Sequence, residues 1–146
     1  YDKWVSYGQA KTANILFSVE LTRRLAGCGI TANAVHPGAI ATTDLARHLG
    51  PSDFGEMMRR TKFSDRVPFK SMEAGAATSV WAAVAPELEG CGGLYLEDCH
   101  VAEVSDDPDN GQSGCRSYAT DPLAARRLWS LSEQLAGERF AWGDDD

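Results

Sequence analysis

The chain has 146 residues, 43% of them hydrophobic, and a formal net charge of −7. This length suits one domain with a hydrophobic core and is short for two. The negative charge argues against nucleic acid or an anionic membrane as a partner, because both attract clustered positive charge. No apolar run of about 18 residues could span a bilayer, and no signal segment opens the sequence, so we expect a cytoplasmic protein.

The first predicted element is a helix from Trp4 to about Leu25, in which only the tolerated Gly8 disfavours helix formation. Its large apolar residues point to more than one face: Ile15, Leu16, Phe17, Val19, Leu21 and Leu25. A helix that is buried on two sides usually has a sheet on one side and another element on the other. Residues 4–25 are therefore also a candidate surface for a homo-oligomer. Gly27 and Gly29 are expected to end the helix.

The segment "ITANAV", residues 30–35, predicts a short strand, although Asn33 makes it less apolar than a fully buried strand. His36 is expected to be a packed residue at the end of this strand. Pro37 and Gly38 then predict a turn. From Leu45 to Phe69 apolar and basic side chains are mixed, which indicates an excursion from the body of the domain with a short helix inside it.

A second long helix is predicted to be capped by Ser71 and to end before Pro86. The segment "GGLYLED", residues 92–98, predicts the second strand, and the polar segment 105–114 predicts a loop. Asp121 is expected to cap a final helix that runs to about Leu135. Residues 137–146 are expected to form a tail whose "GDDD" ending is solvated.

The resulting order of helix, strand, helix, strand, helix predicts an α/β fold with a parallel βαβ arrangement. Two parallel strands make a poor sheet, because parallel strands are buried on both faces and stable sheets usually contain more of them. The pattern therefore looks like the C-terminal part of a doubly wound, Rossmann-type parallel sheet.

Four cysteines are present at positions 28, 91, 99 and 115, and no two of them form a CxxC pair. A zinc site made of Cys91, Cys99, His100 and Cys115 is conceivable, but structural zinc sites usually contain ligands two to four residues apart. We therefore predict no metal site and interpret the cysteines as reduced, partly buried thiols.

Tyr7 and Lys11 lie four residues apart on the first helix and should share one of its faces. An ammonium close to a phenol favours the phenolate, which would bring the tyrosine into the range of a proton donor or acceptor near neutral pH. The spacing alone is also compatible with ordinary helix surface, so the surrounding sequence has to decide.

The surrounding motifs are "YGQAK" at residues 7–11, followed at a suitable distance by a strand and the Pro37–Gly38 turn. Together with "KTANILFSVELTRRL", "HPGAI" and "GGLYLEDC" they resemble the short-chain dehydrogenase/reductase family over nearly the whole chain. Within the family, these segments most resemble the branch that contains retinol dehydrogenases, protochlorophyllide reductases and the WW-domain oxidoreductase. The resemblance implies a Rossmann-type oxidoreductase that uses NAD or NADP and interconverts a small alcohol and a carbonyl compound.

Residue by residue, the resemblance implies that Tyr7 is the general acid/base and that Lys11 assists it and binds the hydroxyls of the nicotinamide ribose. The segment from Pro37 through Gly38 to Ile40 would cover the nicotinamide. Thr42 fits the family's threonine after the turn; a cap or turn role for Thr42, with Thr43 in its place, is an equal alternative.

The excursion at about residues 45–70 corresponds to the family's substrate lobe. Its apolar side chains are candidates to contact an apolar substrate: Leu45, Leu49, Phe54, Met57 and Met58. Ordinary core packing at helical spacing is the alternative interpretation for most of them.

Three parts of the family pattern are absent: the glycine-rich turn after a first strand, the upstream catalytic serine and the upstream asparagine. The "GCGG" segment at residues 90–93 precedes a strand, and Ser6 points to another side of its helix from Tyr7. We therefore expect residues 1–146 to be the C-terminal half of one domain, without the cofactor-binding N-terminal half and inactive alone. A non-catalytic interaction protein, or a truncated reading frame that does not fold alone, remain alternatives.

Overall fold

The computed structural model describes residues 1–60, 69–107 and 113–141. In these ranges the chain forms four α-helices, namely α1 (Lys3–Leu25), α2 (Pro51–Arg60), α3 (Met72–Val84) and α4 (Pro122–Ala136). Three short strands accompany them: β1 (Ala34–His36), β2 (Tyr95–Glu97) and β3 (His100–Val101). The α/β class is thus confirmed. Phe63 and the rest of 61–68 in the predicted excursion, residues 108–112 of the predicted polar loop, and the "GDDD" tail lie outside the described residues.

The sheet has the order β1-β2-β3. Strands β1 and β2 are parallel, with Ala34 opposite Tyr95, as the predicted βαβ arrangement requires. Strand β3 is antiparallel to β2, so the expectation of a purely parallel sheet was wrong: the sheet is mixed. The two strands are joined by Asp98 and Cys99, both with positive φ (46° and 58°), the backbone of a tight two-residue hairpin turn.

Strand β1 begins at Ala34, four residues later than predicted. The backbone before it bonds to side chains, and the Ala32 carbonyl also accepts from the Gly93 amide at 2.8 Å. The Thr22 hydroxyl accepts from the Ala32 amide and donates to the Ala32 carbonyl, both at 2.9 Å. The Asn33 side chain accepts from Leu94 N at 2.9 Å and donates to the Cys91 carbonyl at 3.1 Å. Side chains thus satisfy part of the hydrogen bonding of the backbone before β1.

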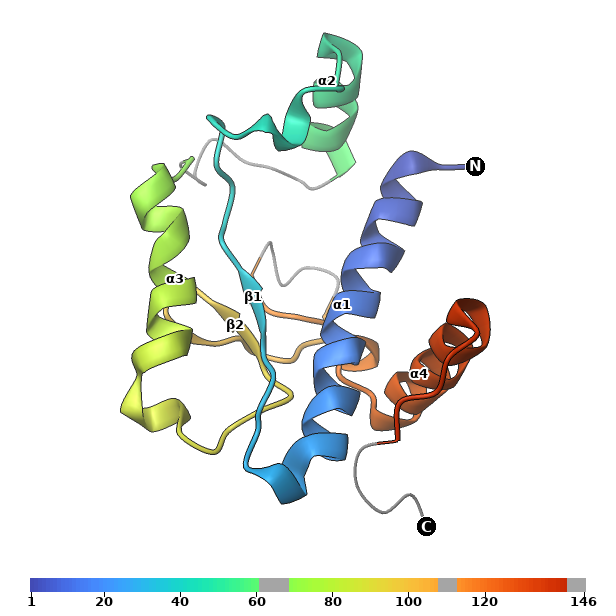
Figure 1. Ribbon diagram of the computed structural model, residues 1–146. Helices are drawn as coiled ribbons and strands as arrows, with labels where there is room; N and C mark the ends of the chain where they lie inside the picture. The colour runs from blue at the N-terminus through green and yellow to red at the C-terminus, as the bar shows by residue number, and fades with distance from the viewer. Residues whose placement is uncertain (61–68, 108–112, 142–146) are drawn as a thin grey trace.

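The elements form layers, with the sheet between α3 and α1 and with α4 packed on the outer side of α1 (Figure 1). The core between the layers contains Ile15, Leu16 and the fully buried Leu96. On the outer side, the Phe17 ring stacks on Trp129 of α4 at 5.6 Å between centroids. The predicted burial of the first helix on two sides is therefore confirmed, and α4 supplies the second side.

The predicted helix ends are confirmed where local chemistry decides them. Ser71 Oγ accepts from Ala74 N at the start of α3, and Asp121 Oδ1 accepts from Leu123 N at the start of α4. Gly29 adopts the left-handed conformation just after α1 and its short 3-10 extension. No helix among the described residues has the length and apolar character to cross a membrane.

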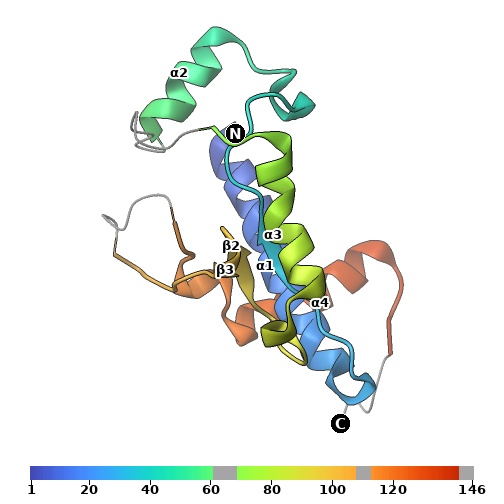
Figure 2. The same cartoon turned by 90° about the vertical axis from the view of Figure 1, so that its left-hand side faces the viewer.

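Helix α2 stands apart from the layers, beyond the N-terminal end of α1 (Figure 2). None of its residues is fully buried. Two ion pairs connect it to the start of α1: Lys3 with Asp53, and Asp2 with Arg60 at 2.8 Å. Helix α2 confirms the short helix predicted in the excursion, and charge rather than a buried core ties it to α1.

Candidate functional site

Tyr7 and Lys11 lie on one face of α1, as their spacing predicts. The Lys11 Nζ atom is 5.3 Å from the centroid of the Tyr7 ring. The Tyr7 side chain is 47% exposed and Lys11 is exposed, so both can reach a ligand. Within the described residues no carboxylate forms an ion pair with Lys11, which leaves its ammonium open to a ligand's hydroxyl groups.

Tyr95, the first residue of β2, is an electrostatic neighbour of Tyr7. Burial raises the pKa of Tyr95 to about 12, with smaller contributions from Glu97, Cys115 and Tyr7. The Tyr95 ring also lies 6.3 Å from the ring of His36, the last residue of β1. Tyr7 is therefore close to the parallel strands, and its neighbour Tyr95 keeps its proton at neutral pH.

The segment after β1 leaves the carboxyl end of a parallel strand, which is where open α/β sheets bind ligands. Pro37 is exposed, and Gly38 has a φ of 81°, a conformation that glycine adopts without strain. Ile40 is half-buried and packs against α3, since a Cβ added at Gly75 would lie only 2.1 Å from Ile40 Cδ1. The segment from Pro37 to Ile40 is thus anchored at one end by apolar packing.

The two threonines after this turn differ. Thr42 is exposed, whereas the Thr43 hydroxyl donates to the Ile40 carbonyl at 3.4 Å. The Thr43 hydroxyl therefore stabilises the turn. Among the described residues, the Thr42 hydroxyl forms no hydrogen bond with the rest of the chain.

The predicted substrate-lobe residues fall into two groups. Phe54, Met57 and Met58 lie on one side of α2 at helical spacing and are exposed or half-buried. Leu45 is 71% exposed in a short 3-10 turn (Asp44–Ala46), and Leu49 is half-buried just before α2. None of the five side chains is fully buried, so ordinary core packing does not account for their positions.

His36 ends β1 as predicted, but it is exposed, so the expectation that it is packed was wrong. Cys28, Cys91 and Cys99 are exposed, which also corrects the expected partial burial; only Cys115 is half-buried. All four thiols are free. In the described part of the chain no three His, Cys, Asp or Glu side chains gather as metal ligands.

Ser6 and the "GCGG" segment have structural roles. The Ser6 hydroxyl donates to the Asp2 carbonyl at 3.0 Å. A Cβ added at Gly92 would lie 2.6 Å from Thr22 Oγ1, so this glycine lets its loop approach α1 closely. Neither residue is placed to polarise a substrate or to hold a phosphate beside Tyr7.

Lys70 and Asp98, which no sequence pattern indicated, form an ion pair beside the turn that follows β1. The two residues are 28 positions apart. No local pattern links them, because the connection depends on the hairpin between β2 and β3.

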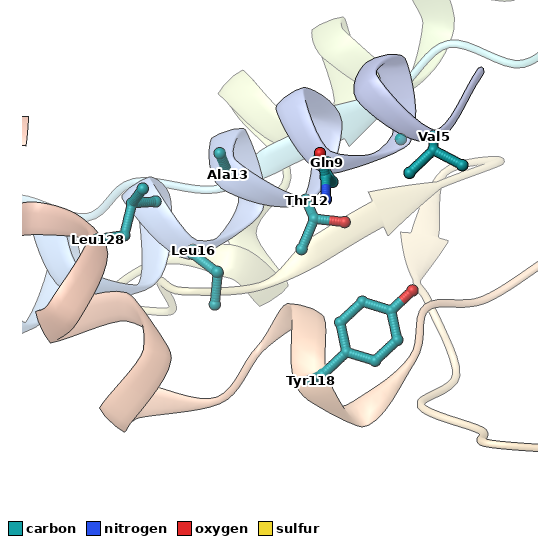
Figure 3. Close-up of a pocket in the computed structure, with 8 residues that line it drawn as sticks. Val5, Gln9, Thr12, Ala13, Leu16, Tyr118 and Leu128 are labelled. Atoms are coloured by element: carbon teal, nitrogen blue, oxygen red, sulfur yellow. The ribbon is translucent and has the colours of Figure 1, made fainter. Parts of the chain in front are cut away.

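A hollow of about 600 Å³ lies on a different face of α1 (Figure 3). Its lining is mostly apolar and includes Val5, Gln9, Thr12 and Leu16 of α1 together with Tyr118 and Leu128. These α1 residues recur at helical spacing on a face turned away from Tyr7 and Lys11. The hollow is therefore separate from the tyrosine–lysine pair.

Known proteins similar to this chain are oxidoreductases. It is 42% identical over 140 residues to the WW domain-containing oxidoreductase of Danio rerio, which covers 95% of this chain and 30% of that protein. It is 44% identical over 132 residues to a probable oxidoreductase of Streptomyces lividans, covering 88% of this chain and 44% of that protein. A short-chain dehydrogenase/reductase of Penicillium roqueforti is 39% identical over 135 residues, 92% of this chain and 39% of the relative. The chain thus spans less than half the length of these relatives, and no family model matches it.

Proposed function

We propose that this chain, which is related over most of its length to oxidoreductases of the short-chain dehydrogenase/reductase family, carries the proton-transfer part of an enzyme that interconverts an alcohol and a carbonyl compound. The observation that carries this proposal is the Tyr7–Lys11 pair, on one exposed face of α1 with a 5.3 Å separation between ammonium and ring. In reduction, Tyr7 donates its hydroxyl proton to the carbonyl oxygen, and in oxidation it accepts the proton of the alcohol. Lys11 would hold the ribose hydroxyls of the cofactor.

The residues fit the nicotinamide end of NAD or NADP. The turn from Pro37 to Ile40 leaves the carboxyl end of β1, and the positive φ of Gly38 shapes the turn at that edge of the sheet. When bound, the cofactor supplies or accepts the hydride. The described residues do not include a glycine-rich turn between a strand and a helix N-terminus that would hold its pyrophosphate.

The substrate we propose is a small, apolar alcohol or carbonyl compound. The argument is the partly exposed apolar side of α2, with Phe54, Met57 and Met58, close to the start of the helix that carries Tyr7. Methionine side chains adapt to irregular apolar ligands.

The free thiols are compatible with a reducing, cytoplasmic location.

We also propose that these 146 residues do not turn over substrate alone, because hydride transfer needs a positioned cofactor. Thermal unfolding with and without millimolar NAD(H) and NADP(H) tests this point. We expect one midpoint that none of the nucleotides changes. An upward shift with one of them would reveal a nucleotide site within the chain and refute the proposed inactivity.

A second candidate function is association without catalysis, through the hollow beside α1 (Figure 3). The observation in its favour is the exposure of Val5 (52%) and Tyr118 (61%) at this hollow. A second copy of the chain would cover them. The mass of the protein measured over a range of concentrations separates the two: a dimer that a Val5→Asp change disrupts would support association, and a constant monomer mass would exclude it.

A further inference from the structure

The turn between Pro37 and Ile40 is in contact with Lys70, the residue that leads into α3. A Cβ added at Gly38 would lie 2.7 Å from Lys70 Cδ and Cε and 2.9 Å from Nζ. The aliphatic part of the lysine therefore lies directly over the backbone of Gly38. In addition, the Lys70 amide donates to the Ala39 carbonyl at 2.8 Å. Main chain and side chain of one residue thus hold two consecutive residues of the turn.

The ammonium of Lys70 is held in turn by Asp98. The two side chains form an ion pair. Hydrogen bonding to Lys70 lowers the pKa of the Asp98 carboxyl, and His100 and His36 lower it further. Asp98 is therefore ionised at neutral pH, and the titratable groups that face it are Lys70, His36 and His100.

The position of Asp98 is fixed by the fold. Asp98 and Cys99 form the left-handed turn between β2 and β3, a backbone that aspartate tolerates better than most residues. The Cys99 amide donates to Thr78 Oγ1 at 3.2 Å, and Thr78, on α3, is only 1% exposed. The hairpin turn is thus tied to the same helix against which Ile40 packs, so Asp98 is a fixed support for Lys70.

We propose that Lys70, supported by Asp98, is a positioning residue that fixes the Pro37–Ile40 turn for the bound cofactor. This inference rests on the proposed function. An isolated surface ion pair contributes little to stability, but this pair joins three segments that are distant in sequence: the turn after β1, the start of α3 and the β2–β3 hairpin. The pair, which we call the Lys70 clasp, preorganises the turn, and binding is tighter when a loop is already ordered.

The clasp can be tested on the chain without any cofactor. The reporter is the amide of residue 70, which bonds to the Ala39 carbonyl and exchanges with solvent only when that contact opens. Nuclear magnetic resonance gives its exchange rate and the backbone order of residues 38–42. Asp98→Asn removes the charge, keeps the left-handed turn accessible and leaves residue 70 itself unchanged. Lys70→Met keeps the aliphatic part and removes the ammonium.

We expect Asp98→Asn and Lys70→Met to accelerate exchange at residue 70 by about 10-fold and to lower the order of residues 38–42. Lys70→Arg, which keeps the charge, should restore most of both. The matched control is Lys3→Met, which breaks the ion pair with Asp53 and should leave residue 70 unaffected. Two results would overturn the clasp. One is an exchange rate at residue 70 that stays within twofold of the unmodified chain in both clasp variants. The other is an equal rise of this rate in Lys3→Met.

The role toward the cofactor has a separate readout. In a protein of the relatives' length that carries this chain, Asp98→Asn should raise KM for the nicotinamide nucleotide by roughly 10-fold and leave kcat nearly unchanged. An equal loss in kcat, without a change in KM, would overturn the positioning role. The exchange experiment needs no activity, so a clasp that forms while a protein of the relatives' length that carries this chain lacks oxidoreductase activity would count against the proposed function and not against the clasp.

Discussion

The Lys11 ammonium lies 5.3 Å from the centre of the Tyr7 ring, one helical turn further along the same face of α1. On that face Tyr7 is also an electrostatic neighbour of Tyr95 in the sheet. Tyr7 therefore lies near the parallel strands, and both side chains of the pair remain exposed to a ligand.

The packing of Ile40 against Gly75 makes a prediction about stability. A Cβ at Gly75 would lie 2.1 Å from Ile40 Cδ1 and 2.9 Å from Cγ1. In Gly75→Ala, overpacking of about 1–3 kcal/mol should outweigh the gain in helix propensity of about 1 kcal/mol, so the free energy of unfolding should fall. In an Ile40→Ala background the obstruction is gone, and the same change should stabilise the protein. Urea unfolding of the four proteins measures both effects.

The control for this cycle is Gly8→Ala on α1, where an added Cβ has no atom within 4 Å. It should stabilise the chain in either background. If Gly75→Ala is equally stabilising with Ile40 present, the turn after β1 is not anchored on α3 as described.

The buried carboxylate of Glu20 predicts a dependence of stability on pH. Its side chain is 1% exposed and accepts hydrogen bonds from Arg23 at 2.7 Å and Arg24 at 2.9 Å. Burial on its own would raise the pKa of this carboxyl, but the two arginines outweigh it and hold the pKa below the ordinary value of 4.5. Glu20→Gln should cost about 1–2 kcal/mol at pH 7, because a neutral amide accepts weaker hydrogen bonds from the two arginines than a carboxylate does.

The lowered pKa of Glu20 determines how the effect of Glu20→Gln depends on pH. Because the folded-state pKa is lowered, the stabilisation by Glu20 is complete above pH 4.5 and is lost as the pH falls through the folded-state value. The difference in unfolding free energy between the unmodified chain and Glu20→Gln should therefore shrink below pH 4.5. Glu56→Gln, which breaks an exposed pair with Arg60, should have a much smaller effect at every pH. A difference for Glu20→Gln that is constant with pH would contradict this account.

The attachment of α2 predicts a dependence on salt. The ion pairs Lys3–Asp53 and Asp2–Arg60 join α2 to α1, and none of the residues of α2 is fully buried. Salt at about 1 M shortens the screening length to about 3 Å and weakens exposed pairs. Hydrogen exchange of residues 51–60 should therefore accelerate with salt, while that of α3 does not. Arg60→Gln should accelerate it at low salt, and Arg127→Gln on α4 should not. Equal acceleration in α2 and α3 would show that salt acts on the whole domain.

Local chemistry explains which parts of the fold could be predicted from the sequence. Ser71 and Asp121 cap their helices with their own side chains, and Gly29 ends the 3-10 extension of α1 through its own conformation. Each signal acts within a few residues, so the helices could be placed closely. The Tyr7–Lys11 pair belongs to the same class, since helical spacing alone puts both side chains on one face.

The errors come from contacts between distant residues. Strand β1 is shorter than predicted, and the backbone before it bonds in part to Thr22, which lies ten positions before Ala32. Strand β3 was missed because its hairpin turn, Asp98–Cys99, contains no glycine and so gives a weak turn signal. The clasp between Lys70 and Asp98 depends on that hairpin and could not be seen in the sequence.

The central claim, that Tyr7 transfers the proton in an alcohol–carbonyl interconversion, is tested most directly by one substitution. In a protein of the relatives' length that carries this chain, Tyr7→Phe removes only the hydroxyl. Turnover of nicotinamide nucleotide should fall by at least about 10²-fold, the typical contribution of a general acid or base. Tyr118→Phe, at a tyrosine that lines the separate hollow on α1, should leave turnover nearly unchanged. Near-normal turnover in Tyr7→Phe would contradict the assignment of the site.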